Sequence, residues 1–375
     1  MVLRDHLRPG HRPTDRRLTS LGVGVIGASP HGSWAARSHI PAIAAVPGLH
    51  LAAVCTSRSN SAREAAEAYG VPAFTDPNDL AGHPEVDLVV VAVNVPTHVD
   101  LVGAAVRAGR PVYCEWPLGV TTAQAVTIAD STGDLPTAVG LQARSAPALR
   151  HAAALLAEGA IGDLESVSAT AFSSRGAHRV ADGKRYLFDA ATGANLLTIE
   201  GGHLLDALFL LCGEPVELTG RALVRRPEVA DDTGRALTVS APDTVTVAAA
   251  LPGGAPLTAH LAQGSTALHR TEIVLLGSDG ALTIRTTAPG GIQMAPLELH
   301  LARGRIAAPE PVTIPAGMTS TTAAVDLPAT AVNVAEALAG FAAVLHGRQH
   351  PASPPDFGHA VTRHRSLDLV APPAG

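Results

Sequence analysis

The chain has 375 residues, which is enough for two domains that share a large buried core. Hydrophobic residues make up 46% of the chain and charged residues 16%, as is ordinary for a folded globular protein. The formal net charge is -6 and no basic stripe is present, which argues against nucleic acid as a direct partner. No apolar segment is long enough to cross a bilayer, so no membrane association is expected.

The N-terminal segment and the cysteines predict where the protein works. Residues 1–20 are rich in arginine but lack the apolar run of a secretory signal, so we expect a disordered leader. The cysteines Cys55, Cys114 and Cys212 are far apart, and no Cys-x-x-Cys or Cys/His cluster predicts a metal site. A chain without a disulfide framework is expected in the reducing cytoplasm.

The first predicted strand leads into a glycine-containing turn. The apolar run Leu21–Ile26 is typical of a strand buried on both faces, and a helix is expected over Ser33–Ile43. Between them, Gly27 and Gly32 stand at the first and last glycine of a dinucleotide-binding fingerprint, with Ser29 at the middle one. Ser29 could donate its hydroxyl to a phosphate. The alternative is a strand-to-helix turn that binds no ligand.

The second predicted strand, Leu49–Cys55, ends at the point where a dinucleotide site selects between NAD and NADP. NAD-binding proteins normally place an acidic residue there, on the ribose hydroxyls. This chain has Thr56, Ser57 and Arg58 instead, and a basic residue between hydroxyls suits a 2′-phosphate. The sequence therefore favours NADP over NAD. The alternative is that Arg58 is a solvated loop residue.

The rest of the first half alternates between helical and strand patterns, which predicts a parallel, doubly wound sheet. Serine or threonine three residues before an acid, at Ser61 and Glu64 and again at Thr97 and Asp100, predicts two capping boxes. The expected elements are a helix over Ser61–Tyr69, a strand and turn over Phe74–Asp79, a strand over Asp87–Val93, a helix from Thr97 to near Gly109, a strand over Arg110–Cys114, a helix over Thr121–Ser131 and a strand over Thr137–Leu141.

Three loops of this half resemble one protein family. They read G-V-I-G at 24–27, N-V-P-T-H at 94–98 and Y-C-E-W-P-L-G at 113–119. These motifs are similar to those of the Gfo/Idh/MocA family, named for glucose-fructose oxidoreductase, inositol dehydrogenase and a rhizopine catabolism protein. The resemblance implies an N-terminal Rossmann domain, which we assign to 21–145. It also implies a C-terminal α/β domain with a large open, mostly antiparallel sheet, assigned to 146–375.

One branch of the family is most similar. The family signature Glu-Lys-Pro reads Glu115-Trp116-Pro117 here. Together with GASPHGSWAARSH at 27–39 and GLQAR at 140–144, this resembles the branch that contains the fungal galactose-regulon repressor, a regulator that binds a dinucleotide without being a working dehydrogenase. The loops and the resemblance give these candidate cofactor-binding residues: Gly27, Ser29, Gly32, Trp34, Thr56, Ser57, Arg58, Asn94, Pro96, His98, Glu115, Trp116, Pro117 and Arg144.

The second half predicts a broad antiparallel or mixed sheet with a few helices. One face of such a sheet needs a cover, and in the family that face often packs on another subunit, so we expect a homodimer or homotetramer. The expected elements are helices over 146–158, 202–212, 328–346 and 356–370, strands near 165–172, 216–224, 244–251, 257–263, 271–276 and 281–286, a polar irregular segment over 173–193 and an extended loop over 305–327.

The resemblance places a catalytic histidine at His203 and an associated aspartate at Asp206. Their spacing of three residues lets both lie on one face of a helix. Tyr186 and Lys184, which is the only lysine of the chain, are the other candidates for catalysis by proton transfer. The alternative for His203 is a cap at a helix N-terminus that bonds only the backbone.

Two functions remain open at this point. The first is an NAD(P)-dependent oxidoreductase of a sugar, a cyclitol or a related small polar alcohol or carbonyl. The second is a dinucleotide-binding regulator without activity, which is favoured by Trp116 at the family's lysine position and Ile199 at the position of its other aspartate. Because His203 and Asp206 are kept and most family members are enzymes, the sequence favours the oxidoreductase, with NADP as cofactor and NAD as the alternative.

Overall fold

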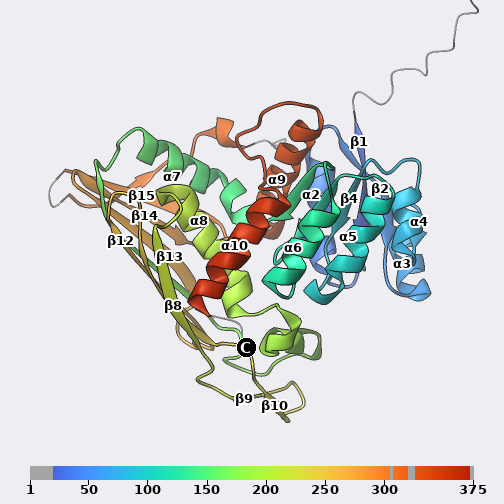
Figure 1. Cartoon of the computed structure of the whole chain (residues 1–375), viewed down its shortest axis with the longest axis horizontal. Coiled ribbons are helices and arrows are strands. Elements are labelled where there is room, and N and C mark those ends of the chain that lie inside the picture. The colour runs from blue at the N-terminus through green and yellow to red at the C-terminus, as the bar shows by residue number, and fades with distance from the viewer. Residues whose placement is uncertain (1–19, 305–306, 320–325, 372–375) are drawn as a thin grey trace, which may run out of the picture.

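A computed structural model describes residues 20–304, 307–319 and 326–371. The expected leader lies almost entirely outside these described residues, as do parts of the predicted loop over 305–327. Two sheets organise the described chain, and helices lie between them (Figure 1). Among these residues no helix combines the length and the apolar character needed to span a membrane.

The N-terminal sheet has six parallel strands in the order β3-β2-β1-β4-β5-β6. This order, with the crossover next to β1, confirms the predicted doubly wound Rossmann sheet. Its central strands are apolar throughout because both faces are covered by helices. The strands are β1 (Leu21–Ile26), β2 (Leu49–Cys55), β3 (Ala73–Phe74), β4 (Leu88–Val91), β5 (Val112–Glu115) and β6 (Thr137–Gly140).

The helices of this half lie on both faces of the sheet. Thr121 caps α6, because its hydroxyl oxygen accepts from the backbone N–H of Gln124 at 3.2 Å. In chain order the helical elements are α1 (Trp34–Arg37), α2 (His39–Ala45), α3 (Ser59–Tyr69), α4 (Pro77–Gly82), the 3-10 turn η2 (Val95–Thr97), α5 (His98–Arg107) and α6 (Thr122–Ser131).

The structure corrects one predicted helix and one predicted turn. The helix expected over Ser33–Ile43 is two helices, α1 and α2, which meet at Ser38. A continuous helix would place Pro41 in its interior, whereas a helix that begins at His39 keeps this proline in the first turn, where it is tolerated. The turn expected at the end of 74–79 instead begins helix α4, and the Asp76 side chain accepts from the backbone N–H of Asn78.

Both predicted capping boxes are wrong. Helix α3 begins at Ser59, two residues early, so Ser61 lies inside the first turn and its hydroxyl donates to Thr56 Oγ1 at 2.8 Å. Thr97 already has a helical backbone because the turn η2 runs directly into α5. Its hydroxyl therefore donates backward to the carbonyl oxygen of Asn94 at 3.0 Å and caps nothing.

The second sheet has eight strands in the order β16-β15-β14-β13-β7-β12-β11-β8, and every neighbouring pair is antiparallel except β7 with β12. The predicted open, mostly antiparallel sheet is therefore confirmed. The sequence analysis missed β15, β16 and the hairpin of β9 and β10. The strands are β7 (Leu164–Ser173), β8 (Glu217–Leu223), β9 (Glu228–Ala230), β10 (Ala236–Thr238), β11 (Thr244–Ala250), β12 (Pro256–Gln263), β13 (Arg270–Gly277), β14 (Gly280–Thr286), β15 (Leu297–Arg303) and β16 (Glu310–Val312).

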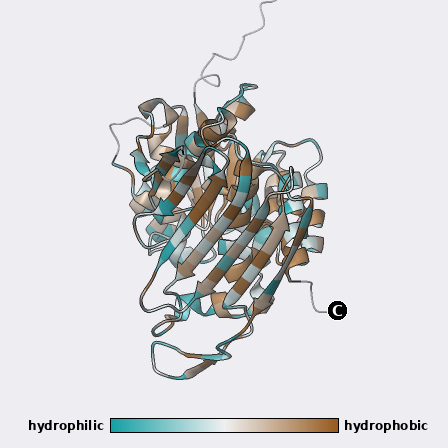
Figure 2. Cartoon of the chain, turned by 90° about the vertical axis from the view of Figure 1, so that its left-hand side faces the viewer, coloured by the Kyte–Doolittle hydropathy of each residue, from teal (hydrophilic) through white to brown (hydrophobic). Residues whose placement is uncertain are grey.

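Helices cover only one face of this sheet. The inward side chains of its strands pack with α7 (Pro147–Ala157), α8 (Gly202–Cys212) and α10 (Phe357–Val370) in one continuous core that reaches the N-terminal sheet. The opposite face carries a mixture of polar and apolar side chains, and no described helix lies over it (Figure 2). Leu276 on this face is 46% exposed.

The last helices return to the N-terminal half. Helix α9 (Ala329–Leu345) packs against α2, and its buried side chains Val334, Leu338 and Phe341 join the core under β1 and β4. Helix α10 packs against α6 and lies between the two sheets (Figure 1). Residues beyond 328 therefore contribute to the packing of both halves of the molecule.

Candidate functional site

A cavity of about 590 Å³ opens at the carboxyl ends of the N-terminal strands, between them and the second half of the chain. We call it the main cavity. The loops after β1, β4 and β5 border it from one side, as expected for ligands of a doubly wound sheet. The segment that precedes α8 borders it from the other side through Ile199, and the first turn of α8 does so through His203.

A second cavity of about 500 Å³, the side cavity, continues the main one along the sheet edge. The two share Gly27, Val93 and Asn94, so together they form one groove. Thr56 and Arg58 border the side cavity beyond β2. A groove of this length across the strand ends fits an extended dinucleotide.

Gly27 keeps the turn after β1 open. Its φ is +97°, a conformation that favours glycine, and an added Cβ would lie 2.4 Å from the carbonyl oxygen of Ala92. Glycine is therefore required for this turn to pack closely against the end of β4. The helix that follows has only four residues, Trp34–Arg37, so the expected long helix at the phosphate position is absent.

Trp116 forms the floor of the main cavity and is 5% exposed. Its indole Nε1 donates to the carbonyl oxygen of Thr198 at 2.7 Å, and its ring lies 4.7 Å from the ring of His364. Gly202 gives the indole its space, because an added Cβ would lie 2.4 Å from Nε1. The only polar atom of this side chain is thus already bonded within the protein, and it cannot replace the lysine ammonium of the family motif.

His203 borders the main cavity at the first turn of α8 and is 2% exposed. Its Nδ1 has no hydrogen-bond partner among the described residues. Burial lowers the pKa of His203 to about 4, although the nearby charge of Asp206 opposes this shift. The imidazole is therefore neutral at neutral pH and can accept a proton. This pKa lies well below the value of about 6.5 that is ordinary for histidine.

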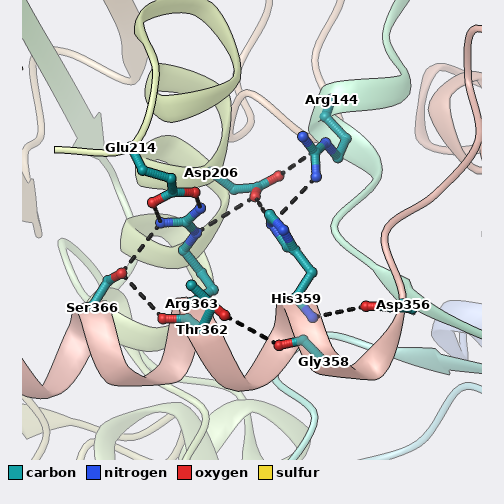
Figure 3. A network of polar contacts seen from close by, with 9 residues as sticks. All are labelled: Arg144, Asp206, Glu214, Asp356, Gly358, His359, Thr362, Arg363 and Ser366. Atoms are coloured by element: carbon teal, nitrogen blue, oxygen red, sulfur yellow. Dashed lines mark hydrogen bonds and ion pairs between the residues drawn. The ribbon is translucent and has the colours of Figure 1, made fainter. Parts of the chain in front are cut away.

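Asp206 turns away from the main cavity into a buried charged network (Figure 3). Its Oδ1 lies 2.6 Å from His359 Nε2 and 3.5 Å from Arg363 Nε, and its Oδ2 lies 3.6 Å from Arg144 Nε. Arg363 is fully buried and also pairs with Glu214 at 2.6 Å. Burial raises the pKa of Asp206, but the His359 hydrogen bond and the surrounding positive charges bring it below its ordinary value.

The carboxylate of Glu115 borders the main cavity and is held by a buried histidine. Its Oε1 lies 2.8 Å from His39 Nε2, which comes from the start of α2. His98 is also buried, and its ring nitrogens lie 3.1 Å and 3.2 Å from the carbonyl oxygens of Leu118 and Val93. His98 therefore connects two loops and does not reach the cavity.

The structure thus brings most of the predicted site residues together. Those that border the main cavity are Gly27, Gly32, Trp34, Asn94, Glu115, Trp116, Pro117, Lys184, Tyr186 and His203. Those that border the side cavity are Gly27, Ser29, Thr56, Ser57, Arg58 and Asn94. Those that border neither are Pro96, His98, Arg144 and Asp206.

Five polar residues at the main cavity were not predicted: Ser33, Arg37, Gln142, Arg175 and Gln293. Gln142 and Gln293 are 2% and 4% exposed, and their Oε1 atoms have no partner among the described residues. Gln142 stands in the GLQAR motif at 140–144, so the family resemblance could have identified it as a site residue. Ser33 and Arg37 stand in the motif at 27–39, whereas nothing in the local sequence distinguishes Arg175 and Gln293. No cluster of potential metal ligands is present in the described part of the chain.

Comparison with known proteins identifies the same two halves of the chain that the structure shows. Residues 21–138 match the model of the oxidoreductase family with an NAD-binding Rossmann fold, GFO_IDH_MocA, and residues 147–286 match the Gal80p C-terminal domain. The chain is 30% identical over 283 residues to a dTDP-3,4-didehydro-2,6-dideoxy-alpha-D-glucose 3-reductase of Streptomyces violaceoruber, covering 74% of this chain and 75% of that protein. The protein therefore belongs to the Gfo/Idh/MocA oxidoreductase family.

Other relatives include enzymes and regulators. Dehydrogenase aclE of Aspergillus oryzae is 35% identical over 207 residues, which cover 52% of this chain but only 56% of that relative. A super-repressor mutant of Gal80p from Saccharomyces cerevisiae has the same fold, with a TM-score of 0.82, 19% identity and coverage of 94% and 95% of the two chains. The structure of levoglucosan dehydrogenase in complex with NADH and levoglucosan also has this fold. Its TM-score is 0.78, its sequence identity is 20%, and the match covers 94% of this chain and 96% of that one.

Proposed function

We propose that the protein is an NAD(P)-dependent oxidoreductase that transfers a hydride between nicotinamide and a sugar, a cyclitol or a related small polar alcohol or carbonyl. The observation that carries this proposal is the continuous groove, which runs along the strand ends and enters a cavity bordered by His203, Lys184 and Tyr186. Dehydrogenases among the relatives and the NADH complex of levoglucosan dehydrogenase support it.

Five polar side chains at the cavity then have a role in the reaction or in substrate binding. The bound nicotinamide supplies or accepts the hydride. In the oxidation direction, the neutral imidazole of His203 accepts the proton of the substrate hydroxyl. The side-chain amides of Gln142 and Gln293 can both donate and accept, which suits the hydroxyl groups of a polyol. Tyr186 and Lys184 are the alternative proton-transfer groups.

We propose NADP(H) as the preferred cofactor. Arg58 is exposed beside the side cavity, with Thr56 and Ser57 next to it, and no acidic residue borders that cavity among the described residues. This arrangement suits a 2′-phosphate better than a free ribose hydroxyl pair. NAD(H) remains the alternative, since NADH is the cofactor in the levoglucosan dehydrogenase structure.

The test is a turnover assay of the full chain with a panel of sugars, cyclitols and ketones and with each cofactor. His203→Ala is expected to lower turnover by roughly 10²–10⁴-fold, because the proton acceptor is lost, while NADP(H) affinity stays nearly unchanged. Arg63→Gln, a substitution in an exposed pair with Glu67, is the matched control. Full turnover of His203→Ala would instead assign the proton to Tyr186 or Lys184.

A regulator without activity is the second candidate. It is favoured by Trp116, which bonds the Thr198 carbonyl and leaves no ammonium at the position of the motif lysine, and by Ile199 at the position of the family's other aspartate. If the wild-type protein binds NADP(H) but transfers no hydride to any compound of the panel, this candidate gains. Trp116→Lys then tests whether the missing lysine alone silences the site.

We also propose a homodimer or homotetramer formed through the open face of the eight-stranded sheet (Figure 2). Leu276 and Leu223, which are 46% and 38% exposed, would then be covered. Light scattering at micromolar concentration should show more than one chain per particle, and a monomer would contradict the proposal. A cytoplasmic location is proposed because Cys55, Cys114 and Cys212 are all unpaired.

A further inference from the structure

Three cationic side chains border the main cavity although they are distant in the sequence. Arg37 ends α1, Arg175 follows β7, and Lys184 lies in the 3-10 segment η4 (Asp182–Phe188). Lys184 is also the only lysine among 375 residues. We call these three residues the cationic wall.

The protein itself neutralises only part of this positive charge. Arg175 Nη2 lies 2.6 Å from Glu200 Oε1. Among the described residues, neither Arg37 nor Lys184 forms an ion pair with a carboxylate. The Arg37 guanidinium instead lies 6.0 Å from the centroid of the Trp34 ring. Both residues are exposed to solvent at the cavity, so their charges are accessible to a ligand that enters it.

The charges of the wall are close enough to affect one another. Partial burial, followed by the charges of Arg37 and Arg175, lowers the pKa of Lys184 below its ordinary value. Tyr186 borders the same cavity, and burial raises the pKa of its hydroxyl, so it stays neutral. An anion placed among these groups would remove their mutual repulsion.

The segment that carries Lys184 is held in place by a buried carboxylate. Arg185, the next residue, forms an ion pair with Asp231, which is 1% exposed in the turn between β9 and β10. Asp231 Oδ1 in turn accepts from the hydroxyl of Thr233 at 2.6 Å and from the backbone N–H of Arg235 at 2.9 Å. Lys184 is thus positioned at the cavity by neighbours that are themselves fixed.

We propose that the cationic wall binds a carboxylate or phosphate group of the substrate, while another hydroxyl or carbonyl of the same substrate reacts beside His203. This inference rests on the proposed oxidoreductase function and narrows its substrate class from neutral polyols to sugar acids or sugar phosphates. Arg37 can bind two oxygens of such a group at once, and Lys184 adds a compact charge.

The diphosphate of the cofactor is a second source of the same chemistry. The experiment therefore uses protein already saturated with NADPH. Calorimetric titration with D-glucose, D-glucuronate and D-glucose 6-phosphate should show that the two anions bind at least ten-fold more tightly than the neutral sugar at low salt, with the difference shrinking as salt is added. Lys184→Gln and Arg37→Gln should each lower the affinity for the anions by roughly ten-fold and leave that for glucose unchanged.

Arg63→Gln is the matched control, since Arg63 is an exposed arginine paired with Glu67 and borders neither cavity. Equal affinity of the wild-type protein for glucose and the anions overturns the inference. A loss of NADPH affinity in Lys184→Gln and Arg37→Gln, with anion affinity unchanged, also overturns it, because the wall would then serve the cofactor. If the anions bind as expected but the turnover panel shows no hydride transfer with either cofactor in its oxidised or reduced form, the proposed oxidoreductase fails and the anion site stands.

The single lysine allows an independent measurement on the wild-type protein. Acetic anhydride acetylates accessible amines, and mass spectrometry of the peptide that contains Lys184 follows this one side chain. D-glucuronate is expected to slow the acetylation of Lys184 at least three-fold, whereas D-glucose at the same concentration should not. Equal rates in the presence of both sugars would contradict the inference.

Discussion

One group of charged side chains surrounds Asp206 on helix α8 and another lines the main cavity, and the two groups differ in how their charges are balanced. Around Asp206, the carboxylates of Asp206 and Glu214 pair with the cations of Arg144 and Arg363, and the fully buried Arg363 contacts both acids (Figure 3). At the main cavity, Arg37 and Lys184 have no carboxylate partner among the described residues. Paired, buried charges hold the fold, and unpaired charges at a cavity are available to a ligand.

The largest expected effect tests the buried side of this comparison. Arg363→Met removes the guanidinium and leaves Asp206 and Glu214 short of a partner, with Asp206 still buried. The expected cost is about 3 kcal/mol of unfolding free energy, at the lower end for a broken buried pair because Asp206 keeps His359 and Arg144, and urea denaturation measures it. Lys184→Met, at the cavity, should change it by less than about 0.5 kcal/mol. Equal losses in the two variants would remove the distinction between the two groups.

The next effect concerns two buried histidines that stay neutral. Burial lowers the pKa values of His203 and His364 to about 4, below the value of about 6.5 expected in the unfolded chain. Between these values the unfolded state binds protons that the folded state does not, so stability falls as the pH drops from about 6.5 to 4, by roughly 3 kcal/mol for each histidine.

Unfolding measured at several pH values checks this prediction. The lowered pKa of Asp206 acts in a separate window, because its contribution is present above about pH 4 and is lost as the pH falls further through the folded-state pKa. His364→Asn should flatten the dependence between pH 6.5 and 4 without removing the loss at lower pH. A stability that is constant from pH 7 to 4.5 would contradict the assignment of neutral, buried histidines.

The smallest expected effect tests an unpaired charge in the side cavity. Arg58→Gln should weaken NADPH binding by roughly 1.5–3 kcal/mol, because a charge-assisted contact to the 2′-phosphate is lost, and should leave NADH binding unchanged. Calorimetric titration with both cofactors measures the difference, again with Arg63→Gln as the control. If the wild-type protein binds NADH as tightly as NADPH, the cofactor preference proposed here is wrong.

Much of the fold could be predicted because its signals are local. Apolar runs such as Leu88–Val91 and the alternation of helix and strand indicate a parallel sheet without any knowledge of the distant chain. The errors arose where the backbone conformation of neighbouring residues determines the hydrogen-bond partner of a side chain. Ser61 and Thr97 have the spacing of capping residues, but the helix start at Ser59 and the turn at 95–97 give their hydroxyls other partners.

Site residues could be predicted from the sequence only where they lie in a motif that resembles the family pattern. Trp116, His203 and the loop after β2 stand in recognisable positions of the family pattern. Arg37, Arg175 and Gln293 belong to three separate segments, and only tertiary packing brings them to one cavity. The same limit applies to Asp206, because its partners His359 and Arg363 come from α10, more than 150 residues later.

The return of α9 to the first sheet has a consequence for how the chain is made. When the ribosome has released the first 145 residues, the apolar surface that later receives Val334, Leu338 and Phe341 is still uncovered. Synthesis must continue through almost the whole chain before that surface is buried. The nucleotide-binding half therefore comes first in the sequence but is among the last parts of the fold to be completed. A fragment that ends near residue 145 would expose an apolar, aggregation-prone surface.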